Sequence, residues 1–364
     1  MPYGSVNADL MTTSDGVSSS GLYGFKNRLI NSAMVIDQRN AGATLTLSGS
    51  SQFAVDRFVA SKDTAGATCT AQRSTTSTTG FVNSFLWTTT TGATSGASDE
   101  SVIWQNIEGY NVADLAWGTA SAATVTLSFW VRSSLTGTFG VSFRSPSGSR
   151  NYVGSYTINS ANTFEYKTVT VAGDTTGTWA TDNSTGLRIT WDMGCGTSKS
   201  TTAGSWGAGN LPGLTGGVKV SQNTGATFYI TGVQLEKGST ATSFDYRPYS
   251  AELAMCQRYY QKVTTGVNDR GMGVGFYYTS STMISQIPFQ TYMRAAPTLD
   301  VNSGTNYFIF YTNNSNQQFN TVTLNDATPY TGAVTAGSLS GTSGSSGQFK
   351  TNNASTSLAF TAEL

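Results

Sequence analysis

Short segments in which apolar and polar residues alternate recur along this chain at intervals of about ten residues, and no other pattern constrains its fold as strongly. The clearest runs from Thr124 to Arg132, where Val125, Leu127, Phe129 and Val131 alternate with Thr124, Thr126, Ser128 and Trp130. Further segments of this kind cover residues 139–143, 152–156, 166–171, 187–191, 218–220 and 228–235. A period of two suits strands with one buried face. Strands at this spacing without helices between them predict an all-β chain built as an antiparallel β-sandwich.

The composition favours a folded core connected by turns. Of the 364 residues, 38% are hydrophobic and 12% aromatic, whereas 11% are charged and the formal net charge is zero. A chain this rich in apolar residues and this weakly charged lacks the signature of disorder. It also lacks the basic surface that nucleic-acid binding needs, so we predict no nucleic-acid partner.

The sequence contains no histidine, and this removes much catalytic and metal chemistry. Neither a Ser-His-Asp nor a Cys-His nucleophile system can form within one chain, and zinc sites that use histidine are excluded. Three cysteines, Cys69, Cys195 and Cys256, are too few for a disulfide framework. We therefore predict no metal site, no cofactor and no enzymatic activity.

Four segments follow from the pattern. Residues 1–24 are polar and rich in Gly and Ser, which predicts an extended N-terminal anchoring arm. Residues 25–249 contain the strands above and form the first β-sandwich. The phase of alternation shifts at Gly232 in its last strand, which indicates a β-bulge. Residues 250–262 form a helical linker, and residues 263–364 form a second, smaller β-sandwich domain.

The linker carries the one convincing helix signal in the chain. Ser250 is an acceptable N-cap, and Glu252 suits the first turn of a helix. A helix of about three turns is marginal alone and must pack on something. We expect it to contact neighbouring copies of the chain through Leu253, Cys256, Tyr259 and Tyr260.

The second domain contains few apolar residues for its length. Residues 273–278, 283–287 and 307–311 predict strands, whereas Thr331 to Gly347 is rich in Gly, Ser and Thr and predicts a loop. About a hundred residues of this composition make a weak isolated core, so several copies are expected to associate.

Three blocks of sequence resemble a known group of proteins. Residues 25–42 and 55–58 read FKNRLINSAM, IDQRNAG and VDRF, similar to an opening "NRIINGAM…IDQRNAG…VDRW", with Phe58 in place of Trp. Residues 232–262 read GVQLEKGSTATSFDYRPYSAELAMCQRYYQK, and residues 294–297 with 360–364 are similar to "MRAAPT…AEL". Together these blocks resemble bacteriophage tail-fibre and related receptor-binding virion proteins, which have a jelly-roll-like domain followed by a small C-terminal β domain.

The resemblance implies a role and a location. It implies a homotrimeric virion protein of the phage tail, whose N-terminal arm binds other virion proteins and whose C-terminal domain is the receptor-binding knob. The receptor would be a host surface glycan or an outer-membrane protein. The N-terminus shows neither a basic region nor an apolar core, so no signal peptide is expected, and no run is apolar enough for a transmembrane segment.

Aromatic residues supply the candidate glycan contacts, because sugar rings stack on aromatic faces. Trp117 and Trp206 are flanked by Gly in expected loops, whereas strand residues such as Trp130 and Trp191 are expected to pack in the core or on the sandwich surface. In the second domain, Tyr and Asn side chains indicate an adaptable recognition surface or a contact between copies of a trimer. The candidates there are Tyr307, Tyr311, Asn313 and Tyr330.

Two other functions remain open at this stage. The same β domains would serve a head fibre, a capsid decoration or a tail adaptor protein with no receptor role. A glycan depolymerase that uses carboxylates alone is the other alternative, with Glu108 and Asp114 beside Trp104 and Tyr110 as a conceivable glycosidase pair.

Overall fold

The computed structural model describes residues 26–264 and 266–364 and is almost entirely β-structure, with a single α-helix in these ranges. The chain divides into two compact units between Tyr249 and Ser250, referred to below as unit 1 and unit 2. The predicted all-β antiparallel sandwich class is confirmed.

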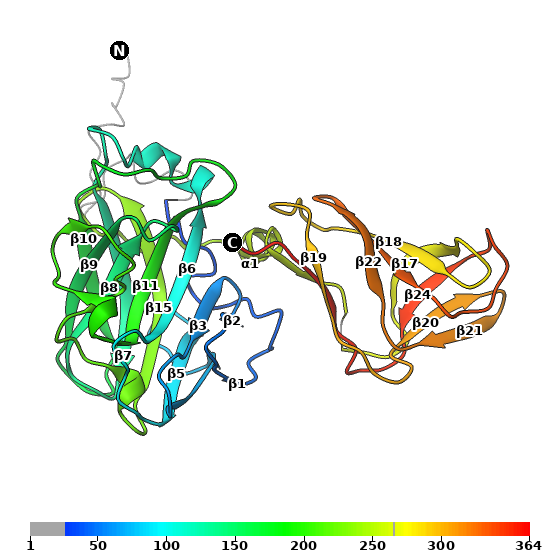
Figure 1. The fold of residues 1–364 in the computed structure, drawn as a ribbon, viewed down its shortest axis with the longest axis horizontal. Helices are drawn as coiled ribbons and strands as arrows, with labels where there is room; N and C mark the ends of the chain where they lie inside the picture. Colours follow the sequence, from blue (N-terminus) through cyan, green and yellow to red (C-terminus); the bar gives the residue numbers. More distant parts are fainter. Residues whose placement is uncertain (1–25, 265) are drawn as a thin grey trace, which may run out of the picture. The chain divides into compact units, whose positions relative to one another are not determined.

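Unit 1 is a sandwich of two antiparallel sheets (Figure 1). The six-stranded sheet has the order β1 (Leu45–Thr46), β4 (Thr68–Ser74), β5 (Ser84–Thr91), β15 (Thr227–Lys237), β7 (Val125–Ser133), β10 (Glu165–Val171). The seven-stranded sheet has the order β13 (Trp206–Gly207), β9 (Asn151–Ile158), β8 (Gly137–Arg144), β11 (Thr185–Cys195), β6 (Glu100–Glu108), β3 (Phe58–Ser61), β2 (Gln52–Val55). A short parallel pair, β12 (Ser200–Thr201) with β14 (Gly213–Leu214), lies in the segment after β11. Single 3₁₀ turns are η3 (Gly109–Asn111), η4 (Ala113–Leu115), η5 (Thr197–Lys199) and η6 (Val220–Gln222).

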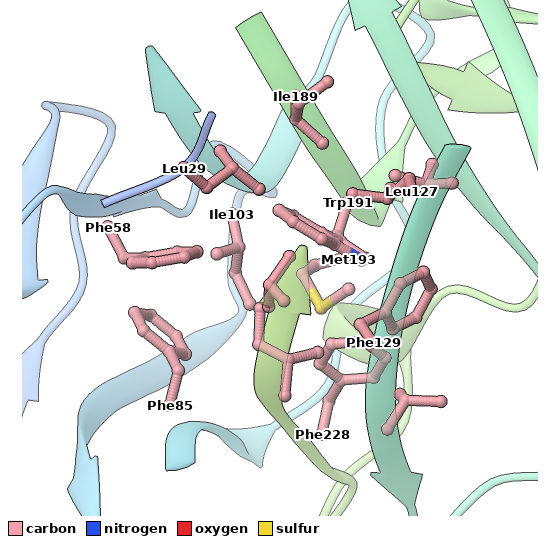
Figure 2. Packing of buried hydrophobic residues seen from close by; sticks show 14 of the residues in the cluster. Leu29, Phe58, Phe85, Ile103, Leu127, Phe129, Ile189, Trp191, Met193 and Phe228 are labelled. Carbon is pink, nitrogen blue, oxygen red and sulfur yellow. The ribbon is translucent and has the colours of Figure 1, made fainter. Parts of the chain in front are cut away.

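The core of unit 1 lies between the two sheets, because the alternating apolar residues of both sheets point inward. In β7, Leu127 and Phe129 are completely buried, and they face Trp191 of β11 across the core. Figure 2 shows side chains of both sheets converging there, and the rings of Phe129 and Trp191 meet edge to face with centroids 5.8 Å apart. Burying one side chain of this size contributes about 1.5–3 kcal/mol, so these contacts stabilise the packing of the two sheets on each other.

The turn over residues 31–42 is built on side-chain hydrogen bonds rather than on a strand. Asn31 has φ of 59° and exchanges hydrogen bonds with Ile36, its Nδ2 donating to the carbonyl oxygen at 2.7 Å and its Oδ1 accepting from the amide at 2.9 Å. Asp37 accepts the amides of Asn40 and Gly42 at 2.9 and 2.6 Å. These residues belong to the blocks that carry the resemblance, and their roles here are structural.

Segments from the beginning and the end of unit 1 meet on the central strand β15. The side chain of Asn27, which is buried, accepts the amide of Leu235 at 3.0 Å and donates to the carbonyl oxygen of Val233 at 2.9 Å. Arg247 donates to the carbonyl oxygens of Asn27 and Leu29. The two sequence blocks that are most distant within unit 1 are therefore one structural feature.

The predicted β-bulge at Gly232 is confirmed. The register of β15 against β7 shifts between Thr231, which faces Trp130, and Gln234, which faces Ser128. Gly232 has φ of 58°, a left-handed conformation that favours glycine. A Cβ atom at this position would lie 2.5 Å from the ring of Phe81, so glycine also makes room for that ring.

Unit 2 is a smaller sandwich. Its seven-stranded sheet has the order β21 (Ser315–Phe319), β20 (Phe308–Thr312), β24 (Ser346–Thr351), β17 (Gly271–Tyr277), β18 (Met283–Pro288), β23 (Thr331–Ala336), β22 (Thr323–Thr328). A three-stranded sheet has the order β16 (Tyr260–Lys262), β25 (Leu358–Thr361), β19 (Thr298–Val301). Leu358 and Phe360 of β25 join Tyr277, Phe308 and Phe349 of the larger sheet in one core.

The helical linker is shorter than predicted. The helix α1 spans Tyr249–Gln257, so Ser250 lies inside its first turn and is not the N-cap. Residues 260–262 form strand β16, in which Tyr260 pairs with Thr361 of β25. The helix predicted from the sequence is too long, because the spacing of apolar residues does not show that the backbone of residues 260–262 pairs with strand β25.

The loop predicted over Thr331–Gly347 is wrong at both ends. Residues 331–336 form strand β23, which lies between β18 and β22, and β24 begins at Ser346. The glycine that favoured a loop has a packing role, since a Cβ atom on Gly332 would lie 2.3 Å from the ring of Phe360. A small residue in a strand can therefore be selected by a neighbouring aromatic ring.

Replacing Gly232 by alanine tests the bulge. Gly232→Ala should lower the free energy of unfolding by about 1–3 kcal/mol, because it combines a left-handed backbone with a clash against Phe81. Gly216→Ala is the matched control, since Gly216 has φ of 72° but open space around its would-be Cβ. Chemical denaturation of both variants measures the difference. Equal losses would show that the Phe81 contact contributes nothing.

Candidate functional site

A groove of about 460 Å³ lies on the outer face of the six-stranded sheet of unit 1. It is referred to below as the aromatic groove, and it is lined by Thr79, Phe81, Ser128, Trp130, Tyr166, Gly232, Thr242, Ser243, Phe244 and Tyr246. None of the described residues that line it carries a charge. Apolar rings next to hydroxyl groups are the chemistry that recognises a neutral sugar.

The floor of the aromatic groove comes from two neighbouring strands. Trp130 of β7 and Tyr166 of β10 face each other directly in the register, with ring centroids 5.4 Å apart and ring planes tilted by 52°. The alternation that buries Phe129 and Val131 turns Trp130 to the outer face, where it is half-buried. Tyr166 is 43% exposed, so its ring offers a surface to a ligand.

One wall of the aromatic groove is a cluster of three rings. Phe81 stacks on Tyr246 with centroids 5.6 Å apart, and Phe244 meets both edge to face at 5.0 and 4.9 Å. Tyr246 is 61% exposed, and its hydroxyl donates to the carbonyl oxygen of Gly80 at 2.9 Å. Because Gly232 admits the ring of Phe81, the bulge helps to shape this wall.

The segment that carries Phe244 and Tyr246 is held on the sheet by buried polar side chains. Glu236 accepts the amide of Thr242 at 2.9 Å and its hydroxyl at 2.6 Å. Gln234 accepts the amide of Asp245 at 2.8 Å and donates to Glu236 at 2.8 Å. Since both anchoring side chains are buried, the wall is fixed in place before any ligand arrives.

The rings of the two predicted contacts Trp117 and Trp206 do lie together, where they pack against each other. The two rings and Trp179 form a cluster with centroids 4.9, 5.3 and 5.6 Å apart. Trp117 is buried, and its indole N–H donates to the carbonyl oxygen of Ala123 at 2.8 Å. Its ring also lines a small pocket together with Trp179 and Leu187, and a ligand role for Trp117 stays a prediction. Trp206 is half-buried against this cluster, and a ligand role for it stays a prediction.

The four candidates in unit 2 do not form one site. Tyr311 lies on β20 and Tyr330 beside β23, and three strands separate these two in the sheet. Asn313 and Asn314 have φ of 48° and 58° in the two-residue turn between β20 and β21, which explains Asn at both positions. Tyr307 is half-buried, and its ring packs on Gly304, where a Cβ atom would lie 2.2 Å from the ring. Tyr330 is 67% exposed and packs against Tyr292 at 4.7 Å.

The predicted contact between copies through the helix is wrong for three of its four residues. Cys256, Tyr259 and Tyr260 are at most 3% exposed within a single chain, so their side chains have no surface to offer a neighbour. Leu253 is half-buried, and its role stays a prediction.

The carboxylates of the glycosidase alternative are not arranged as an acid and a nucleophile. Glu108 is 1% exposed, so a polysaccharide cannot reach it. Asp114 forms a bidentate ion pair with Arg28, with both N–O distances 2.8 Å, and a further contact of 3.6 Å with Lys237. In the described ranges, no group of three or more Cys, Asp or Glu side chains could hold a metal ion. No helix in those ranges is long and apolar enough to cross a membrane.

Sequence reasoning missed the groove residues Phe81, Trp130, Tyr166, Phe244 and Tyr246. The alternation did place Trp130 on the face opposite the core, but nothing in the sequence showed that residues 79–81 and 242–246 fold back beside it. The run Phe244-Asp245-Tyr246 was a usable signal, since two aromatic residues there flank a single charged one.

Comparisons with known proteins give no assignment. No known family matches the chain, and no curated protein matches its sequence. The enzymatically active domain of tailspike protein 4 from bacteriophage CBA120 aligns with 58% of this chain at 14% identity and a TM-score of 0.33, and the alignment covers 22% of that chain. A putative sugar-binding protein from Bacteroides thetaiotaomicron covers 58% at 10% identity and a TM-score of 0.33, with all of its own chain aligned. A family 61 carbohydrate-binding module in complex with β-1,4-galactotriose covers 59% at 12% identity and a TM-score of 0.30, also over its full length. At these TM-scores the likenesses carry no argument about this chain.

The three cysteines provide a test of burial. Cys69, Cys195 and Cys256 are all at most 2% exposed, and burial raises the pKa of the Cys69 and Cys195 thiols. None of them should react with a thiol reagent such as dithionitrobenzoate in the native protein, and all three should react after denaturation. Rapid release of one equivalent of chromophore from the native protein would contradict the burial of that thiol.

Proposed function

We propose that this chain is a non-enzymatic glycan-binding protein, and that the aromatic groove of unit 1 holds the sugar chain. The observation that carries this proposal is the pairing of Trp130 with the exposed ring of Tyr166 opposite the fixed wall of Phe81, Phe244 and Tyr246. Stacked rings contribute binding energy through their apolar faces, while the exposed Ser243 offers a hydroxyl group to the ligand. The uncharged lining favours a neutral glycan.

The biological setting proposed is attachment of a phage virion to its host through a tail fibre. This part rests on the sequence resemblance over residues 25–262 and near the C-terminus. Several residues of the resembling blocks hold turns and strand contacts in place, as Asn27, Asn31 and Arg247 do. These residues of the resembling blocks therefore form part of the scaffold. The proposed type of receptor, a neutral glycan, is inferred from the residues of the aromatic groove instead.

Substitutions in the aromatic groove test the proposed function. On a glycan array and in titrations with the best neutral glycan, Trp130→Ala should weaken binding by about tenfold or more, as loss of a central aromatic contact does. Tyr166→Ala should weaken it as well, because it removes the exposed ring of the floor.

The matched control is Tyr110→Ala, since Tyr110 is 63% exposed on the same unit but does not line the groove. It should bind glycan as the unchanged protein does. Release of reducing ends from the bound glycan would contradict the non-enzymatic part of the proposal. Binding that survives both groove substitutions would contradict the site.

A homotrimer is the proposed assembly, because the sequence resemblance to phage tail-fibre proteins implies it. Three copies of a 38.3 kDa chain give a mass of about 115 kDa. Multi-angle light scattering of the full chain should give this value across the elution peak. A mass of one chain would contradict the trimer without affecting the groove.

A further inference from the structure

The outer face of the seven-stranded sheet of unit 1 carries two arginines side by side. Arg188 of β11 and Arg144 of β8 lie directly opposite each other in the register, on strands that Figure 1 shows next to each other. Like charges at directly opposite positions of an antiparallel pair destabilise a sheet. This arrangement therefore needs a compensating negative charge.

In the part of the chain that the structure describes, only one of the two arginines forms an ion pair with a carboxylate, although the charge of Glu100 also acts on Arg188. Glu100 contacts Arg144 at 3.2 Å and Lys199 at 3.5 Å, so its charge is already shared between two cations. Arg188 donates from Nε to the side-chain oxygen of Asn106 at 2.7 Å and lies over the ring of Trp104 at 5.5 Å. Among the described residues, no carboxylate forms an ion pair with Arg188, and its two outer nitrogens donate no hydrogen bond.

Burial makes the lack of a carboxylate partner for Arg188 more costly. Arg188 is half-buried, and burial together with the charge of Arg144 lowers its pKa to about 10. The pKa of Arg144 is also lowered, again first by burial. Both shifts mean that the positive charges sit where water does not stabilise them fully.

Polar atoms around the arginine pair lack partners as well. Four shielded atoms on this face have no hydrogen-bond partner among the described residues: Arg144 Nε, Ser142 Oγ, Asn151 Oδ1 and Thr190 Oγ1. They are neighbours in the sheet, because Thr190 pairs with Ser142 and Arg144 pairs with Asn151. A buried polar group without a partner costs about 1–3 kcal/mol, so such a concentration requires an explanation.

We propose that the outer edge of Arg188, which lies beside Arg144 and over Trp104 and is called the arginine patch, binds the carboxylate of an acidic sugar. The outer fork of Arg188 matches a carboxylate in two parallel hydrogen bonds. Trp104 holds the guanidinium plane in place. Ordered water is the partner open to the four shielded polar atoms, because they lie too deep for a sugar to reach. The sugar part of this proposal rests on the proposed glycan-binding function, whereas the anion site stands on the arginines alone.

The first experiment uses small probes on the full chain. Glucuronate should raise the melting temperature in a concentration-dependent way, compared with glucose and with chloride at equal ionic strength, because it binds only the folded state. Inorganic phosphate is run in parallel. Stabilisation by phosphate but not by glucuronate would overturn the assignment to a sugar acid, and stabilisation by neither would overturn the site.

The second experiment uses substitutions of Arg188. Arg188→Gln should weaken glucuronate binding by about tenfold or more, since hydrogen bonds to a charged group are lost. Arg188→Lys keeps the charge without the fork and should lie between the two. It also gives a result if Arg188→Gln does not fold.

A matched arginine on the opposite face provides the control. Arg132 is half-buried, lies over the ring of Tyr229 at 4.9 Å and donates from Nε to the carbonyl oxygen of Asn162 at 2.9 Å. Arg132→Gln should leave glucuronate binding unchanged, and an equal loss there would contradict a specific site at Arg188.

The proposal for the aromatic groove and the proposal for the arginine patch can be contradicted independently of each other. Trp130→Ala should weaken binding of neutral glycans by about tenfold or more but leave stabilisation by glucuronate intact. If no neutral glycan binds while glucuronate still stabilises the protein, the arginine patch stands and the groove function falls. If Arg188→Gln binds glucuronate as well as the unchanged protein does, the arginine patch is overturned and the groove is unaffected.

Discussion

The side-chain amide of Asn27 is the contact on which unit 1 depends, because it joins the beginning of the domain to its last strand. It bonds to the backbone of Leu235 and Val233 while it also accepts the amide of Leu29 at 3.0 Å. The side chain of Gln105 makes the same kind of contact with Ile30. Its Oε1 accepts the backbone amide and its Nε2 donates to the carbonyl oxygen, both at 2.8 Å. Buried amides that replace strand partners in this way let an irregular segment close a sheet without leaving polar groups unpaired.

This closure also creates the aromatic groove. The segment after β15 turns back because Gln234 and Glu236 hold it, and Arg247 ties it to the segment around Asn27. Its two rings then complete a wall against Phe81. The aromatic groove therefore results from the way in which the last segment of unit 1 folds back, and the same buried hydrogen bonds hold its wall in place.

The two outer faces of the sandwich differ in chemistry although both come from the same alternation. Outward positions of the six-stranded sheet at the groove are aromatic or hydroxyl-bearing, whereas those of the seven-stranded sheet include Arg144, Arg188 and Asp192. Asp192 is neutralised by Lys219 and the amides of Cys195 and Leu214. Arg188 forms no ion pair with a carboxylate among the described residues, and this contrast is the basis for the anion site proposed there.

The sequence by itself determined the class of fold, the inward and outward faces of strands such as β7, and the bulge at Gly232, because all three follow from local alternation and glycine geometry. Only the tertiary structure decided the rest. It made a strand of Thr331–Ala336, buried Trp117 and Cys256, and brought Phe81 beside Tyr246 from a position 165 residues earlier. These outcomes depend on which distant ring or backbone group fills the space beside a residue, and a period of two carries no information about that.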